Sequence, residues 1–295
     1  MTRIFVVGGT GTVGRALLGK LRPDAEQGRL TLQVGTRTPD LRAQFACPGV
    51  KLIKLDLNDR FVHRDRVDVL EGCEALFLLT GYTVDMLCQS KGILDAAKAA
   101  GVRHVVHVGI HASETTCVPH IGWHQYIERY IEQLGFTWTH LRPNWFMQNL
   151  RRFISREGDG SLVIRNHLPA GLQVSWIDAR DIGWLAAAIL RDLTRHAART
   201  YPLATERLSF SDIAETLGRS RGKVCRYEEI DFESFLAQRR KPGRDAAYED
   251  SIVSYYQGLR GGLIPECADV FDLRGLLGDS PATMADFALR EMAST

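Results

Sequence analysis

The chain has 295 residues, of which 45% are hydrophobic and 24% charged, so it is long and apolar enough to bury a sizeable core. Its 37 basic and 35 acidic residues leave a formal net charge of +2, which is too even for a typical nucleic-acid binder. No apolar stretch approaches the roughly 18 residues of a membrane helix, and the apolar run near the N-terminus is too short for a signal peptide. We therefore expect a soluble, cytoplasmic protein without a nucleic-acid or membrane partner.

The first half of the chain alternates short apolar runs with helical patterns. The apolar runs predict strands at Ile4–Val7, Leu30–Val34, Val50–Leu55, Ala75–Leu79, His104–Val108 and Phe136–Leu141. Helical spacing of apolar residues predicts helices at Thr12–Leu21, Asp85–Ala100 and Ile121–Leu134, the last two ending before a glycine. This order predicts an α/β fold with a doubly wound parallel Rossmann sheet, whose ligands bind at the carboxyl ends of the strands.

The second half is less regular. Helices are expected at Ser211–Leu217 and Ala246–Leu259, and a strand at Lys223–Tyr227. We expect residues 1–150 to form the dinucleotide-binding domain, with residues 170–205 returning to it. Residues 151–295 are then expected to form mostly a smaller substrate-binding lobe. The oligomeric state is left open by the sequence.

A glycine-rich turn follows the first predicted strand and leads directly into a predicted helix. Its sequence is Gly8-Gly9-Thr10-Gly11-Thr12-Val13-Gly14. Glycine permits a positive φ and a close approach of the backbone to phosphate, and a helix N-terminus offers unpaired N–H groups to a pyrophosphate. A plain strand-to-helix turn is the structural alternative, but the flanking strand and helix favour a dinucleotide site. The residues expected to contact the cofactor here are Gly8, Thr10, Gly11, Thr12, Val13 and Gly14.

The end of the second predicted strand indicates which dinucleotide is bound. NAD enzymes usually place an acidic residue there, whereas this sequence reads Gly35-Thr36-Arg37-Thr38. The guanidinium of Arg37 suits a 2′-phosphate, so we expect NADP(H), although an exposed surface arginine is the alternative. Asp56 and Leu57 follow the third strand and are expected near the adenine, or else Asp56 serves a turn. Thr80, Gly81 and Gly109 lie at the same edge, after the fourth and fifth strands.

Several segments together resemble the NmrA-like family, an atypical branch of the short-chain dehydrogenase/reductase superfamily. They include the glycine turn, the Arg37 turn, the segment Lys54–Asp59, the segment Leu141–Asn149 with its Arg-Pro-Asn-x-Phe-Met-x-Asn pattern, the segment Val174–Ile182 and the segment 269–287. The resemblance implies NADPH-dependent reductases of quinones, dyes, plant phenolic ethers or alkaloid iminium ions. It equally implies regulators that bind NADP(H) without catalysis, because fold does not fix function.

The resemblance also shows where this chain departs from its superfamily. Ordinary members use a Tyr-x-x-x-Lys pair and an upstream serine, but this chain has no Tyr-x-x-x-Lys, and Gly109 stands where the serine is expected. His124 falls where phenolic-ether reductases carry a functional lysine, so it is a candidate to contact the cofactor or donate a proton. A structural histidine is the alternative. Tyr126 is a weaker catalytic candidate, because with Ile127 and Tyr130 it could belong to the core.

The residues after the sixth predicted strand are expected to border the nicotinamide and the substrate. Asn144 and Phe146 are the cofactor candidates. Aromatic and apolar side chains that could line a substrate pocket, or simply pack in the core, are Trp123, Trp145, Phe146, Met147 and Trp176. No metal is expected, because neither the cysteines nor His107, His111 and His120 form a ligand motif.

These observations favour an NADPH-dependent reductase of a small electrophile such as a quinone, an enone or an iminium ion. An iminium ion needs no proton at the carbon that receives hydride, which fits the missing tyrosine. The alternatives are a non-catalytic NADP(H) redox sensor, and a non-redox isomerase or cyclase of secondary metabolism that retains NADP(H).

Overall fold

The computed structural model describes residues 2–59, 63–240, 242–278 and 280–291, and the chain divides into two compact units. The first unit comprises residues 1–110, 122–142 and 180–201. The second comprises residues 111–121, 143–179 and 202–295. Among the described residues, no helix is both long and apolar enough to cross a membrane.

The first unit is organised around a seven-stranded sheet in the order β11-β6-β5-β4-β1-β2-β3. Its strands are β1 (Thr2–Val6), β2 (Leu30–Thr36), β3 (Val50–Lys54), β4 (Ala75–Leu78), β5 (His104–Val108), β6 (Thr137–Pro143) and β11 (Arg199–Leu203). The pairings from β3 through β6 are all parallel. The order 3-2-1-4-5-6 is that of the Rossmann fold, so the predicted fold class is confirmed.

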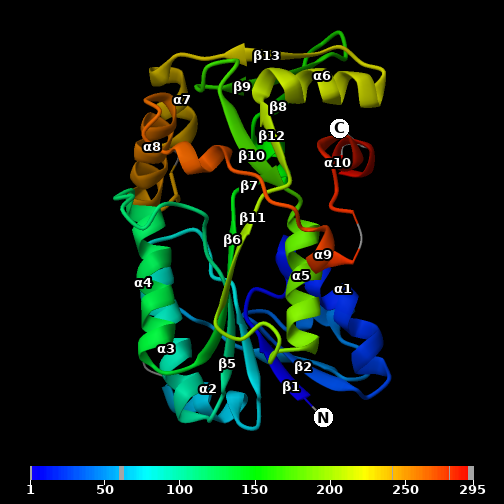
Figure 1. Ribbon diagram of the computed structural model, residues 1–295, viewed down its shortest axis with the longest axis vertical. Helices are drawn as coiled ribbons and strands as arrows, with labels where there is room; N and C mark the ends of the chain where they lie inside the picture. Colours follow the sequence, from blue (N-terminus) through cyan, green and yellow to red (C-terminus); the bar gives the residue numbers. More distant parts are fainter. Residues whose placement is uncertain (1, 60–62, 241, 279, 292–295) are drawn as a thin grey trace. The chain divides into compact units, whose positions relative to one another are not determined.

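Helices cover both faces of this sheet. They are α1 (Thr12–Glu26), α2 (His63–Leu70), α3 (Met86–Ala99), α4 (Pro119–Gln133) and α5 (Ala179–Arg191). In Figure 1, α3 and α4 lie on one side of β5, and α1 and α5 lie on the other. All the strands and helices predicted in the first half are present, with bounds that shift by a few residues. Val7, Leu55 and Leu79, predicted as strand ends, lie in the loops just beyond β1, β3 and β4.

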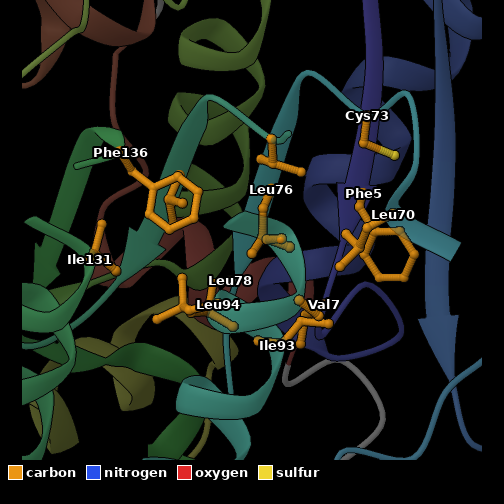
Figure 2. Close-up of a cluster of buried hydrophobic side chains, with 14 of the residues drawn as sticks. Phe5, Val7, Leu70, Cys73, Leu76, Leu78, Ile93, Leu94, Ile131 and Phe136 are labelled. Atoms are coloured by element: carbon orange, nitrogen blue, oxygen red, sulfur yellow. The ribbon is translucent and has the colours of Figure 1, made fainter. Parts of the chain in front are cut away.

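One apolar cluster fills the space between the sheet and α2, α3 and α4 (Figure 2). Phe5, Leu76 and Leu78 come from adjacent strands and have no exposed surface. Ile93 and Ile131 come from α3 and α4 and are equally buried. Burial of such a side chain contributes about 1.5–3 kcal/mol, so this cluster fixes the helices against the sheet.

Helix α5 lies close against α1 on the opposite face of the sheet. A Cβ at Gly183 of α5 would lie 2.6 Å from the carbonyl oxygen of Val13 and 2.7 Å from Cβ of Ala16. The same pair of helices is joined where Arg191 donates to the carboxylate of Asp24. The absence of a side chain at Gly183 therefore sets how closely the two helices approach.

The second unit contains two three-stranded mixed sheets, in the orders β12-β10-β7 and β13-β9-β8. Its strands are β7 (Trp145–Phe146), β8 (Ile154–Arg156), β9 (Leu162–Asn166), β10 (Gln173–Ile177), β12 (Glu206–Ser209) and β13 (Cys225–Glu229). Its helices are α6 (Phe210–Arg221), α7 (Phe232–Arg239), α8 (Ala246–Arg260), α9 (Arg274–Leu277) and α10 (Met284–Glu291). The helices expected at 211–217 and 246–259 correspond to α6 and α8, and the strand expected at 223–227 overlaps β13.

Two glycine substitutions test the packing of α5 on α1. We expect Gly183→Ala to lower the free energy of unfolding by about 1–3 kcal/mol, because the new methyl group overlaps backbone. Gly19→Ala is the matched control in α1: a Cβ there meets nothing within 4 Å, so the substitution should stabilise by about 0.5–1 kcal/mol. Urea unfolding of both variants measures the difference. Equal effects would contradict the close approach.

Candidate functional site

The turn between β1 and α1 is so tightly packed that side chains cannot replace its glycines. Gly8 has φ +80°, and a Cβ there would lie 2.5 Å from the carbonyl oxygen of Leu79, beyond β4. A Cβ at Gly14 would overlap the carbonyl oxygen of Gly8. The chain therefore folds back on itself at the centre of the sheet, where β1 and β4 are neighbours.

The N-terminus of α1 is open to an anion. Gly11 is its N-cap, no side chain caps the first turn, and no acidic residue lies in it. Gly11 and Thr12 are exposed, whereas Val13 and Gly14 are buried beneath them. Uncapped backbone N–H groups and the helix dipole together favour a phosphate group at this position.

The other candidate cofactor residues in the first unit lie after neighbouring parallel strands. Arg37 follows β2 and Asp56 follows β3, and both are exposed. Oδ1 of Asp56 accepts from the backbone N–H of Asn58 at 3.0 Å, so Asp56 serves a turn, and its contact with adenine stays a prediction. Leu57 is half-buried beside it. After β4, Thr80 is half-buried and Gly81 exposed.

Gly109 lies immediately after β5, where its N–H donates to the carbonyl of Leu141 at 2.8 Å. A Cβ at this position would lie 2.8 Å from Oε1 of Glu128 and 3.3 Å from Cε1 of His107. A serine here would have to displace Glu128. The carboxylate of Glu128 thus occupies the space that a side chain at position 109 would need.

Helix α4 presents His124 and Tyr126 in opposite directions. His124 is only 8% exposed, whereas Tyr126 is 70% exposed. Residues two positions apart in an α-helix point about 200° apart around its axis, so the side chains of His124 and Tyr126 cannot face the same site. The exposure of Tyr126 excludes the core packing that was its alternative, whereas its catalytic role stays a prediction. The ring of Tyr130 instead lies near α3, where its hydroxyl donates to Asp95.

Glu128 and Arg142 form a buried ion pair between α4 and β6. Nε of Arg142 lies 3.1 Å from each carboxylate oxygen of Glu128, and Nη2 bonds the second oxygen as well. The Glu128 side chain is 3% exposed and that of Arg142 is 16% exposed. A bidentate pair of this kind offsets much of the cost of burying two charges.

Two buried histidines on adjacent strands lie near this ion pair. His107 of β5 and His140 of β6 are register partners and are at most 1% exposed. Burial lowers the pKa of His107 to about 3, and the positive charge of Arg142 contributes. Burial likewise lowers the pKa of His140 to about 2. Both rings are therefore neutral at physiological pH.

Ligand atoms of His107, Glu128 and His140 lie within 4.8 Å of one another, as a metal site would require. The guanidinium of Arg142, however, already holds both oxygens of Glu128, and its positive charge disfavours a cation beside it. The arrangement therefore fits a buried ion pair beside neutral histidines better than a metal centre.

The remaining histidines that were considered as metal ligands lie in the second unit. Nε2 of His111 lies 2.9 Å from Oδ2 of Asp269, and the backbone N–H of His120 donates to the hydroxyl of Ser251. Neither histidine belongs to a ligand cluster among the residues that the structure describes.

The second unit holds the candidates after β6. Nδ2 of Asn144 lies 3.4 Å from the carbonyl of Glu266, and the indole N–H of Trp145 donates to Tyr255 at 2.9 Å. Trp145 and Phe146 are half-buried. Met147 and Trp176 have no exposed surface, and the indole N–H of Trp176 donates to the carbonyl of Leu208.

Of the buried polar residues, sequence reasoning did not identify Glu128, His140 or Arg142. A signal was present: His124, Glu128 and Glu132 recur every four residues, which places three polar side chains on one face of a predicted helix. A helix face that covers a sheet is usually apolar, so a polar row there is unusual.

Two glutamate substitutions test the buried ion pair. We expect Glu128→Ala to lower the free energy of unfolding by about 3–5 kcal/mol, because it leaves the Arg142 charge buried without its partner. Glu26→Ala removes the exposed i,i+4 pair with Arg22 in α1 and should cost at most about 0.5 kcal/mol. Chemical unfolding measures both, and a cost below 1 kcal/mol for Glu128→Ala would show that the pair does not hold α4 to β6.

Comparison with known proteins agrees with this architecture. A model of the NmrA-like family matches residues 1–257. NAD(P)H azoreductase from Xenophilus azovorans is 29% identical over 302 residues, which cover 99% of this chain and 98% of the azoreductase.

Solved structures share the fold over nearly the whole chain. The Escherichia coli quinone oxidoreductase QOR2, solved with NADPH, is 22% identical with a TM-score of 0.78, covering 97% of this chain and 98% of its own. NmrA, a negative transcriptional regulator solved with NADP, is 18% identical with a TM-score of 0.75, covering 98% and 95%. Because the family model matches most of its length, the chain belongs to the NmrA-like family.

Proposed function

We propose that this protein is an NADPH-dependent reductase of a small electrophilic organic substrate. The observation that carries the proposal is the turn from β1 to α1, where backbone packing excludes side chains at Gly8 and Gly14 and leaves the helix N-terminus uncapped. That geometry is what a pyrophosphate requires. The relatives named as an NAD(P)H azoreductase and an NADPH-dependent quinone oxidoreductase support the same activity.

Each element at this edge has a role in the proposal. The N–H groups of Thr12 and Val13 bind the pyrophosphate, while that of Gly11 donates to Gly8 within the turn, and Arg37 pairs with the 2′-phosphate. Asp56 and Leu57 contact the adenine, and Thr80, Gly81 and Gly109 line the path to the nicotinamide. When bound, the dihydronicotinamide supplies a hydride to the acceptor.

The substrate is proposed to be a quinone, an enone or an iminium ion. His124 holds the nicotinamide ribose or donates the proton that a quinone or an enone needs. The half-buried Trp123, Trp145 and Phe146 are proposed for substrate contact, with Asn144 beside the nicotinamide. Met147 and Trp176 have no exposed surface, so we propose that they pack beneath the substrate-contacting side chains and do not contact the substrate themselves.

A second candidate function is a non-catalytic NADP(H) sensor. It is favoured by Gly109, which supplies no hydroxyl where the superfamily serine stands, and by the absence of a Tyr-x-x-x-Lys pair. NmrA, a structural neighbour solved with NADP, is a negative transcriptional regulator. The two candidates differ in whether bound NADPH is oxidised.

The choice of cofactor is tested at Arg37. We expect Arg37→Ala to weaken NADPH binding about 10–100-fold, because it removes charge-assisted hydrogen bonds of about 1.5–3 kcal/mol to the 2′-phosphate. NADH, which has no such phosphate, should bind the variant as it binds the wild type. Calorimetric titration measures both dissociation constants, with Arg22→Ala, an exposed arginine at the other end of α1, as the control. Equal losses for both dinucleotides would assign Arg37 a merely structural role.

Turnover is tested by mixing the NADPH-loaded protein with quinones, enones and cyclic iminium ions and following NADPH fluorescence. We expect one class to oxidise NADPH in a single turnover. His124→Ala should slow a proton-requiring acceptor about 100-fold, the loss expected for a general acid. Tyr126→Phe should react at the wild-type rate, because that side chain points into solvent. Tight NADPH binding without oxidation by any acceptor would favour the sensor.

A further inference from the structure

Beneath α4 the first unit contains a continuous row of polar side chains. His124, Glu128 and Glu132 are spaced four residues apart and extend over about 12 Å of the helix. Opposite them, His107 and His140 are register partners on β5 and β6. Four of these five side chains are buried, and Glu132 is partly exposed.

The rings follow one another from the candidate site towards the surface. The ring centroids of His124 and His107 are 5.8 Å apart, and those of His107 and His140 are also 5.8 Å apart. Nε2 of His140 then lies 3.4 Å from Oε1 of Glu132. The side chain of Glu132 is 27% exposed and pairs with Arg129 at the surface.

This row differs from a histidine that is buried for structural reasons. His104, three residues before His107 and therefore on the opposite face of β5, is held by Thr139 at 2.9 Å. By contrast, Nδ1 of His107 and both ring nitrogens of His140 make no hydrogen bond to the described residues. Buried polar atoms normally have a hydrogen-bond partner. If this part of the core served packing alone, apolar residues here would make the fold more stable.

The charges around the row keep its imidazoles in the form that relays protons. Arg142 pairs with Glu128 beside His107, and Arg129 adds a second positive charge near His140. Burial and these cations hold the pKa of His107 and of His140 far below neutrality. A neutral imidazole has one N–H donor and one acceptor nitrogen, so it can take a proton at one side and release one at the other.

We propose that His107 and His140 form a proton relay that connects Glu132 at the surface to His124 at the candidate site. The inference rests on the proposed function, and it assigns a positioning role to the Glu128–Arg142 pair. Ligand atoms of His107 and His140 lie within 4.8 Å of each other, a separation that one water molecule or a ring rotation spans.

Atoms and charges balance when the relay supplies the proton for the reduction of a quinone. Hydride adds two electrons and one hydrogen to the acceptor and leaves a hydroquinone anion, whose oxygen takes a proton from one ring nitrogen of His124. His124 regains a proton at its other nitrogen from His107, His107 from His140, and His140 from the carboxyl of Glu132, which takes one from solvent. The sum is quinone, NADPH and one proton giving hydroquinone and NADP⁺.

The test compares an acceptor that needs a proton with one that does not. 1,4-Naphthoquinone needs one, whereas N-methyl-3,4-dihydroisoquinolinium becomes a neutral amine on receiving hydride alone. We expect His107→Leu and His140→Leu to slow single-turnover reduction of the quinone at least about 10-fold, and to leave reduction of the iminium ion within about 2-fold of wild type. Added imidazole should restore part of the quinone rate, as general-acid replacement requires.

His104→Leu is the matched control, since it removes a buried histidine from the opposite face of the same strand. It should change neither rate. Equal slowing of both acceptors by His107→Leu and His140→Leu, or no slowing of either, would overturn the relay. So would a stoichiometric metal ion in the purified protein that is lost in these variants, because it would occupy the ring nitrogens.

The two proposals fail in different ways. If the wild-type protein oxidises NADPH with neither acceptor, the proposed function fails and the relay falls with it. If wild type is active and the two variants match it, the relay alone fails. If the wild-type protein reduces the quinone but not the iminium ion, imidazole rescue and the solvent isotope effect of the variants decide whether the relay exists. A merely structural role of the two histidines would leave both unchanged.

Discussion

The close approach of backbone to backbone at the end of β1 is the constraint on which the candidate site depends. β1 lies between β2 and β4 in the sheet, so the chain leaving it must turn within a few residues to begin α1. The turn fits only because Gly8 and Gly14 present no side chain to Leu79 and to each other. The same compactness brings the uncapped helix N-terminus to the carboxyl edge of the sheet, where an anionic cofactor would be bound.

The polar layer beneath α4 is a second constraint, and it changes how the site can work. The carboxylate of Glu128 lies where a superfamily serine would place its side chain, and Arg142 holds it there. His107 and His140 stay neutral in that environment. The buried imidazole of His107 therefore lies close to His124, with that of His140 beyond it.

Much of the first unit was predictable, because a buried parallel strand appears in sequence as an apolar run and the helices α1 to α4 each end two residues before a glycine. The short strands of the second unit were less visible: β7 has two residues and β8 has three, too few for any period to show. The position of Arg37 just after a strand was predictable, because the apolar run of β2 ends there, and its contact with a 2′-phosphate stays a prediction. The exposure of Tyr126 was not predictable, since only the orientation of α4 separates it from the buried His124.

The central claim is that this chain binds NADPH and passes its hydride to an organic acceptor. Stereospecifically deuterated NADPH tests this most directly, with an iminium ion as acceptor and the product analysed by mass spectrometry. We expect one deuterium in the amine from only one of the two C4-labelled forms, because a bound nicotinamide presents one face to the substrate. Tightly bound NADPH with no deuterium in the product from either form would contradict the claim and indicate a sensor.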